Sequence, residues 1–305
     1  MPEQDGVLVV DKTTGPTSHD VVAGVRRLFG MRRVGHCGTL DPLATGVLVV
    51  CLGVYTRLSD WLGQGDKVYE TVFMLGAQSD TGDRMGTLQP SALPLPSPNQ
   101  VEAALGAFQG VIQQVPPAYS AVKVEGVRSY QLARRQQSVA LQARRVEVKA
   151  LEILANEPPR LRLRLRCSRG TYIRSLAADL GAALGCGGYV QELRRLQVGS
   201  LGLENACTFD RLRSLEAEGR LGQALVPVHR ALGELRTWCL DEGEAQRFCR
   251  GAALQPTRAG LEDGEWAVYA GEARLLGIGV AAAGVLRPLR VFAAQAVLAE
   301  AGLGA

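Results

Sequence analysis

The chain has 305 residues, of which 47% are apolar and 21% are charged, and its formal net charge is +4. This composition excludes a wholly disordered chain and allows a sizeable core, which we expect to be divided between one large domain and one small domain. No apolar run approaches the roughly 20 residues that a membrane-spanning helix needs, and no leader-like segment opens the chain. We therefore expect a soluble, cytoplasmic protein with no membrane partner.

The spacing of cysteine and histidine argues against a metal centre. The seven cysteines are scattered and never form a Cys-x-x-Cys pair, and the three histidines have no metal-ligand spacing. The sequence also has no Gly-x-Gly-x-x-Gly fingerprint and no Walker loop. These observations predict reduced thiols, no metal and no cofactor.

The positive charge is distributed unevenly. Residues 231–305 hold 7 Arg against 9 acidic residues, a net charge of −2, which leaves +6 on residues 1–230. Nearly all the cations are arginine. Genome composition and a need for planar, bidentate phosphate contacts explain this preference equally well.

The start of the chain predicts a strand, a helix, a loop and a second strand. The apolar run over 6–10 indicates a strand, and apolar residues at helical spacing from Ser18 to Phe29 indicate a helix with Ser18 as its expected cap. A polar stretch with several glycines follows at 33–46. It leads into an apolar strand over 47–52.

Asp41 lies inside this glycine-rich stretch. Pro42 restricts the backbone of Asp41 to extended conformations. Because an aspartate before a proline is most often a turn former, the dipeptide alone predicts a structural role. The whole pattern from Gly35 to Gly46 is what raises the alternative, that the carboxylate carries out chemistry.

The middle of the chain mixes strand and helix signals. β-Branched and aromatic residues over 66–75 predict a strand, and the turn-rich segment 76–83 indicates a hairpin in preference to a metal loop. Four prolines mark 90–98 as a linker. A capping pattern at Asn99 predicts a helix that ends at Gly110.

The second half of the chain adds charge patterns. Residues 161–166 alternate Leu and Arg, so the arginines share one face of the predicted strand, and the lack of acidic residues over 160–174 favours nearby phosphates over a merely solvated face. A helix then runs to Gly185. Residues 120–150 hold seven cations against two glutamates, and short apolar runs after residue 230 predict a small β-barrel.

Three segments in the same order resemble the motifs of the TruB family of pseudouridine synthases. They are Gly-His-Cys-Gly-Thr-Leu-Asp-Pro-Leu-Ala-Thr-Gly at 35–46, Tyr69 with the turn at 76–83, and Cys-Ser-Arg-Gly-Thr-Tyr-Ile-Arg at 167–174. Two positions depart from the family pattern. Thr13 stands where the family has a proline, and Cys37 stands where it has a threonine, which we expect to be a tolerated substitution and not a nucleophile.

The resemblance implies an α+β fold. Residues 1–230 would form the catalytic domain on a mixed, mainly antiparallel sheet with flanking helices, and an insertion at about 120–150 would grip RNA. Residues 231–305 would form a small barrel similar to the PUA RNA-binding module.

The resemblance also implies roles for single residues. Asp41 would be the catalytic nucleophile or base and Arg174 would pair with it. Five further residues have expected roles. By the resemblance, Tyr172 and Leu193 line the substrate pocket. Two alternatives stay open for each of the others: Tyr69 is a stacking platform or a core aromatic, His36 fills the gap left by a flipped nucleotide or is structural, and Lys12 steadies its loop or meets a phosphate.

The implied activity is the isomerisation of uridine 55 in the T-loop of tRNA, by a stand-alone monomer that flips out its target base and needs no obligatory protein partner. Asp41 would attack C1′ of the ribose, attack C6 of the base, or remove the C2′ proton. Two alternatives from other classes are an RNA-binding protein that has lost catalysis and a carboxylate-based glycosidase, which would need a second catalytic acid. A guide-RNA-dependent relative fits less well, because the 120–150 insertion resembles the stand-alone form.

Overall fold

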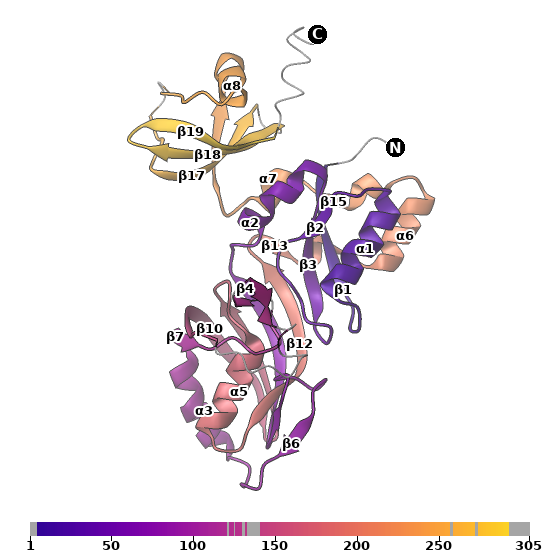
Figure 1. The fold of residues 1–305 in the computed structure, drawn as a ribbon, viewed down its shortest axis with the longest axis vertical. Coiled ribbons are helices and arrows are strands. Elements are labelled where there is room, and N and C mark those ends of the chain that lie inside the picture. The colour runs from indigo at the N-terminus through magenta and orange to yellow at the C-terminus, as the bar shows by residue number, and fades with distance from the viewer. Residues whose placement is uncertain are drawn as a thin grey trace.

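The computed structural model describes residues 5–120, 122–124, 126–129, 132, 141–256, 259–271 and 274–292. The molecule is elongated, with a small C-terminal sheet at one end of the long axis and the hairpin of β5 (Ala77–Ser79) and β6 (Leu88–Pro90) at the other (Figure 1). A large sheet runs between these two ends. No helix of the described residues is both long and apolar enough to cross a membrane.

The large sheet contains eleven strands. They are β1 (Gly6–Lys12), β2 (Val34–His36), β3 (Thr45–Leu52), β4 (Lys67–Leu75), β7 (Gly110–Gln114), β10 (Arg144–Glu157), β11 (Arg160–Cys167), β12 (Gly188–Val198), β13 (Leu201–Gly202), β14 (Ala206–Cys207) and β15 (Leu225–Val226). Its main order is β14-β1-β3-β12-β4-β11-β10-β7. The strand pairs are mostly antiparallel, as the sequence predicted, because β1 to β14 and β12 to β3 are the parallel ones.

β12 joins the two halves of this sheet. Its contact with β3 consists of two parallel residue pairs, Arg194 with Thr45 and Arg195 with Gly46, whereas nine pairs connect it to β4. One half therefore carries β1 and β3, the other carries β4, β11, β10 and β7. The two halves meet beside the start of β3.

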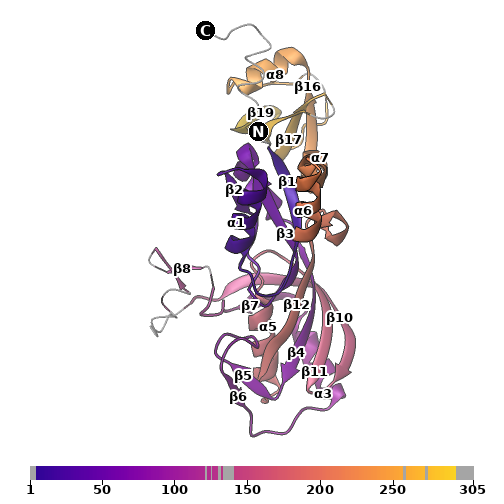
Figure 2. The same ribbon diagram turned by 90° about the vertical axis from the view of Figure 1, so that its right-hand side faces the viewer.

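Helices lie against both halves of the large sheet, and the last of them packs on the small C-terminal sheet instead. They are α1 (Ser18–Phe29), α2 (Ser59–Leu62), α3 (Pro98–Leu105), α5 (Ile173–Ala183), α6 (Phe209–Ala217), α7 (Val228–Ala231) and α8 (Glu242–Cys249). α1 and α6 lie together beside the β1 half, and α3 and α5 lie beside the β4 half (Figures 1 and 2). Each group covers the apolar face of its own half.

Two predicted helix starts are displaced. The cap of α1 is Thr17 and not Ser18, because the Thr17 side chain accepts a hydrogen bond from Asp20 N at 3.1 Å and Asp20 returns the bond to Thr17 N at 2.8 Å. α3 likewise begins with a capping box at Ser97 and not at Asn99. Both errors come from choosing between adjacent polar residues that cap equally well in isolation.

The prediction of an unpartnered arginine face on β11 is wrong. The alternation itself is present, since every leucine of β11 is buried and every arginine is exposed. However, Glu70 of the neighbouring strand β4 accepts hydrogen bonds from Arg162 at 3.0 Å and from Arg164 at 2.7 Å. The sequence pattern could not show this partner, because it lies on a different strand.

Much of the predicted 120–150 insertion falls on residues 121, 125, 130–131 and 133–140, which lie outside the described residues. Within it, β8 (Lys123–Val124) and β9 (Val127–Arg128) form a short hairpin that stands away from the sheet (Figure 2). The last residues of the expected insertion, from Arg144 onward, pair with β7 as the start of β10.

The C-terminal part forms a separate sheet of β16 (Arg236–Leu240), β17 (Gly264–Ala270), β18 (Arg274–Ala282) and β19 (Val285–Val291), in that order. It confirms the predicted small β-rich unit. Four residues of β17 and β18 share one buried cluster with residues of β1 and β3: Ala267, Tyr269, Leu275 and Ile278. The Trp61 indole also donates to Glu265 at 2.8 Å, so the unit packs directly on the rest of the molecule.

Candidate active site

The candidate site is built on residues 37–44, which connect β2 to β3 and are called the Asp41 loop below. Each backbone carbonyl from residue 38 to residue 44 accepts a hydrogen bond. A loop normally leaves many of its carbonyls to water. This one is instead fixed along its length by protein donors, which holds the Asp41 side chain in one place.

Lys12 donates to three of these seven carbonyls. Its ammonium lies under the loop, donates to the carbonyls of Asp41 at 3.1 Å, Pro42 at 3.3 Å and Ala44 at 2.6 Å, and is 1% exposed. Burial lowers the pKa of Lys12 to about 8, while the charge of Asp41 acts in the opposite direction. Of the two alternatives from the sequence, these contacts support the one in which Lys12 steadies its loop.

The start of α1 adds three further ties. The Ser18 hydroxyl donates to Leu40 O at 3.0 Å and accepts from Leu40 N at 2.9 Å, and the Thr14 hydroxyl donates to Leu43 O at 3.1 Å. Gly15 N donates to Pro42 O at 2.9 Å. The Ser18 hydroxyl therefore binds the Asp41 loop, whereas its position in the sequence predicted the N-cap of the helix.

Arg195 of β12 binds the other end of the loop. Its guanidinium donates to the carbonyls of Gly38 at 3.1 Å, Thr39 at 3.3 Å and Val47 at 2.7 Å. The backbone of Arg195 lies so close to Gly46, at φ +97°, that a Cβ on Gly46 would overlap it. Glycine is thus required at the point where the loop enters β3.

The expected ion pair between Asp41 and Arg174 is present. Arg174 Nε donates to Asp41 Oδ2 at 2.9 Å and Arg174 Nη2 donates to Asp41 Oδ1 at 3.2 Å, a bidentate arrangement. The Arg174 side chain is 5% exposed, whereas the Asp41 side chain is 30% exposed. The carboxylate is thus held from the protein side and remains accessible from the other.

The rest of the Arg174 guanidinium is also occupied. Nη1 donates to Thr81 O and Nη2 donates to Tyr119 O, both at 2.8 Å. Asp83 lies 3.9 Å away, and its own carboxylate accepts from the Thr81 hydroxyl and from Met85 N at 2.9 Å each. A hairpin is present, as predicted, but its turn lies at 80–87, because residues 77–79 of the segment predicted as a turn form β5; Thr81 and Asp83 of this turn support Arg174.

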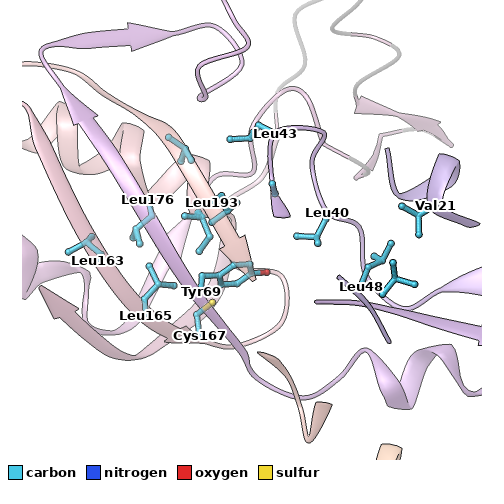
Figure 3. Packing of buried hydrophobic residues seen from close by; sticks show 14 of the residues in the cluster. Val21, Leu40, Leu43, Leu48, Tyr69, Leu163, Leu165, Cys167, Leu176 and Leu193 are labelled. Carbon is cyan, nitrogen blue, oxygen red and sulfur yellow. The ribbon is translucent and has the colours of Figure 1, made fainter. Parts of the chain in front are cut away.

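Tyr69 and Leu193 form an apolar floor next to the loop. Both belong to the buried cluster that also contains Leu40 and Leu43. Figure 3 shows the Tyr69 ring directed from β4 toward the side of Leu40. Because Tyr69 is 8% exposed, only a small part of its ring faces solvent, and burial raises the pKa of its hydroxyl.

Tyr172 stands at the first residue before α5, two positions ahead of Arg174. Its backbone is held by the buried side chain of Gln114, which accepts from Tyr172 N at 2.7 Å and donates to Tyr172 O at 3.1 Å. Burial raises the pKa of the Tyr172 phenol. This clamp connects β7 to the start of α5 and fixes the direction from which Arg174 approaches.

His36 ends β2, immediately ahead of the Asp41 loop. Its ring meets the ring of His19 edge to face, with centroids 5.4 Å apart. His36 therefore lies on the side of the loop that faces α1.

Sequence reasoning missed three residues that hold this site: Arg195, Gln114 and Asp83. A signal existed for Arg195, because alternation from Leu193 along β12 places an arginine on the inward face. The amide of Gln114 and the carboxylate of Asp83 gave no such signal. Gln114 binds the backbone of Tyr172, 58 positions away, and the cation near Asp83 is the distant Arg174.

The described residues contain no group of three or more His, Cys, Asp or Glu side chains arranged to hold a metal ion. All seven cysteines are free thiols. The groups gathered around the Asp41 loop are one accessible carboxylate, one buried guanidinium and two tyrosines.

Family models match most of the chain. Residues 26–173 match the TruB family pseudouridylate synthase N-terminal domain, residues 174–233 match the tRNA pseudouridylate synthase B C-terminal domain, and residues 239–292 match the pseudouridine synthase II TruB C-terminal domain. The two longer matches meet at Arg174, so the Asp41–Arg174 pair joins residues of both.

Similar proteins give the same result. The chain is 41% identical to tRNA pseudouridine synthase B of Ralstonia pickettii (strain 12J), over 95% of each chain. It is 44% identical to tRNA pseudouridine synthase B of Dechloromonas aromatica (strain RCB), over 90% of this chain and 91% of the relative.

Among solved structures, an H/ACA RNP bound to a substrate RNA containing 2′-deoxyuridine matches with a TM-score of 0.73 and 25% identity, over 94% of this chain and 84% of that one. A Cbf5-Nop10-Gar1 complex matches with a TM-score of 0.71 and 28% identity, over 90% of this chain and 78% of that one. The chain belongs to the TruB family of pseudouridylate synthases.

Proposed function

We propose that the chain converts a uridine of tRNA to pseudouridine, at the T-loop position conventionally numbered 55, with Asp41 as the catalytic carboxylate. The observation that carries this proposal is the bidentate Asp41–Arg174 pair, which leaves the carboxylate partly exposed in the middle of a loop whose carbonyls are held by protein donors. A carboxylate held in this way is preorganised to act as a nucleophile or a base. The names of the similar proteins supply the substrate.

The reaction is balanced without any redox partner. The bond from C1′ to N1 breaks, the uracil turns, and a bond from C1′ to C5 forms, while C5 loses a proton and N1 gains one. No electrons enter or leave, so the proposal requires neither a cofactor nor an energy source. The proposal has three forms, which differ in whether Asp41 first contacts C1′ of the ribose, C6 of the base or the C2′ proton.

The target base must leave its stack to reach Asp41. Extrusion costs a few kcal/mol, and less for a base that already lies in a loop. Stacking on an aromatic ring returns on the order of 1 to 3 kcal/mol per base. We assign that contact to the exposed part of Tyr69, with Tyr172 and Leu193 beside it, and we assign to His36 the space left by the flipped nucleotide.

We also propose a division of the chain at about residue 230. Residues 1–230 would be the catalytic domain, including the RNA-gripping insertion at about 120–150, and residues 231–305 would be a PUA-like RNA-binding domain. The separate β16–β19 sheet and the family match that begins at residue 239 support this boundary. Because the C-terminal part has a net charge of −2, its contact with RNA would be local.

The test is tritium release from tRNA that carries C5-tritiated uridine. Wild type is expected to release tritium from position 55, and Asp41→Asn is expected to release none above background. Asp60→Asn is the matched control, because Asp60 is an exposed carboxylate on α2 and its loss should leave the rate unchanged. Undiminished release by Asp41→Asn would refute the catalytic assignment.

The same assay separates the alternatives. Free uracil in the products would indicate a nucleosidase or glycosidase. Salt-dependent tRNA binding by wild type without any tritium release would indicate an RNA-binding protein that has lost catalysis.

A further inference from the structure

Arg195 lies at the point where β12 joins the two halves of the large sheet. Its backbone pairs with Gly46 on β3 and with Tyr69 on β4. It is 2% exposed, and among the described residues its side chain is the largest by volume of those that are fully buried. An arginine at the centre of a sheet is unusual, because burial removes the water that solvates its charge.

The charge of Arg195 has no acidic side chain as a salt-bridge partner in the part of the chain that the structure describes. Three carbonyls take its place, those of Gly38, Thr39 and Val47. Burying a cation on backbone carbonyls alone is costly compared with a well-packed apolar side chain. A residue kept purely for stability would not need this charge.

Apart from Arg195, the residues outside the Asp41 loop that donate to its backbone carbonyls come from one place, whereas Arg174 binds only the Asp41 side chain. Lys12, Thr14, Gly15 and Ser18 all belong to β1 or to the connection into α1. They tie the loop to the half of the sheet that carries β1 and β3. Arg195 comes from β12, the strand that also carries Leu193 and pairs along its length with β4.

Arg195 also acts on Tyr69. Its backbone pairs with Tyr69, and its charge opposes the rise that burial gives to the pKa of the Tyr69 hydroxyl. Arg195 thus binds the loop that carries Asp41 through its guanidinium and lies beside the tyrosine of the floor through its backbone. These two parts of the site come from different halves of the sheet.

We infer that Arg195 is a positioning residue for the reaction, which holds the Asp41 loop in register with Tyr69 across the junction of the two half-sheets. This inference rests on the proposed function. A displacement of about 1 Å between reacting groups is enough to cost on the order of 10²-fold in rate. Arg195 acts on catalysis only through the groups that it fixes, because its own guanidinium is buried beneath them.

The experiment measures single-turnover pseudouridine formation with enzyme in excess, alongside tRNA affinity. Arg195→Met removes the charge and keeps a long apolar stem, and its rate constant is expected to fall about 10²-fold with less than a threefold change in tRNA Kd. Arg194→Met is the matched control, since Arg194 is the adjacent arginine and pairs at 2.8 Å with Asp11 on the other face of the strand. Its rate constant is expected to stay within about threefold of wild type.

Arg195→Lys is the second variant and keeps the protein testable if the methionine variant does not fold. Lysine retains the charge but cannot reach three carbonyls with a planar fork, so its rate constant is expected to fall at least about tenfold at unchanged tRNA Kd. Circular dichroism and thermal unfolding establish that each assayed variant is folded.

Folded Arg195 variants with the wild-type rate constant would overturn the inference. A loss confined to tRNA Kd would also overturn it, because it would assign Arg195 to binding. If wild type itself forms no pseudouridine, it is the proposed function that fails, and this outcome is distinct from a loss that appears only in the Arg195 variants.

Discussion

Asp41 and Arg174 lie 133 positions apart in the chain and meet through two hydrogen bonds, of 2.9 and 3.2 Å. Arg174 reaches this position from the first turn of α5, and every remaining contact of its guanidinium is to protein. The carboxylate therefore has one fixed side and one open side. This relationship determines what single substitutions around it should do.

Arg174→Lys is expected to lower the rate constant of the proposed reaction by on the order of 10²- to 10³-fold, because lysine keeps the charge and loses the bidentate fork. Arg174→Met is expected to lower the free energy of unfolding by about 3 kcal/mol, since it leaves the buried carboxylate of Asp83 without its cation. Single-turnover kinetics and urea unfolding measure the two effects. A rate unchanged in Arg174→Lys would show that the fork geometry is irrelevant.

Gln114→Leu is expected to destabilise the protein by about 2 kcal/mol and to slow the reaction, because Tyr172 N and O both lose their buried partner. The control is Gln113→Leu, one position earlier on β7, whose side chain is exposed and forms no clamp. Urea denaturation gives the stability change for both variants. Equal losses in the two variants would contradict the role of the clamp.

The free energy of unfolding should depend on pH through the titration of Lys67. Burial lowers the pKa of Lys67 to about 8, and its ammonium donates to Gly63 O at 2.6 Å and to Gly65 O at 2.7 Å. Between pH 8 and the usual lysine pKa of 10.5, the unfolded chain holds a proton that the folded chain has released. The free energy of unfolding therefore gains up to about 3 kcal/mol from this group as the pH rises across that window.

Lys67→Met should lack this gain. The measurement is urea denaturation of both proteins at pH 7.5 and pH 10, and the quantity of interest is the difference between their slopes with pH. Lys149→Met, which removes an exposed lysine of β10, should keep the wild-type slope. A slope in Lys67→Met equal to that of wild type would show that Lys67 is charged throughout.

Thiol reactivity should be restricted to one position at neutral pH. Cys239 is exposed, whereas Cys37 and Cys51 are buried with their sulfurs 3.1 Å apart. The hydrogen bond that Cys51 shares with Cys37, together with burial, raises the pKa of Cys51, and burial raises the pKa of Cys167 to about 11. Reaction with Ellman's reagent should show one fast phase, and Cys239→Ser should remove it.

The sequence predicted the strands and helices around the site well, because each carries its own periodic pattern. The strand expected over 66–75 is β4 at 67–75, and the strand expected over 161–166 is β11 at 160–167. It could not predict how the Asp41 loop is held. Those bonds join the loop to Lys12, Ser18 and Arg195, and hydrogen bonds between distant segments leave no periodicity to detect.

The same limit explains the arginine face of β11. Alternation correctly placed its arginines on one side, but the position of Glu70 opposite Arg164 depends on the register of β4 against β11. Register is fixed by the whole sheet and not by either strand alone. For this face to bind RNA, the phosphates must compete with Glu70 for Arg162 and Arg164.

Removing residues 231–305 would uncover part of the apolar layer that β17 and β18 share with β1 and β3. Val47, Val49 and Cys51, the inward residues of the strand that leads out of the Asp41 loop, belong to this layer. A truncated chain would therefore expose hydrophobic surface behind the candidate site and be prone to aggregation. The C-terminal sheet thus keeps this apolar layer covered and supports the candidate site from behind, independently of what its outer face contacts.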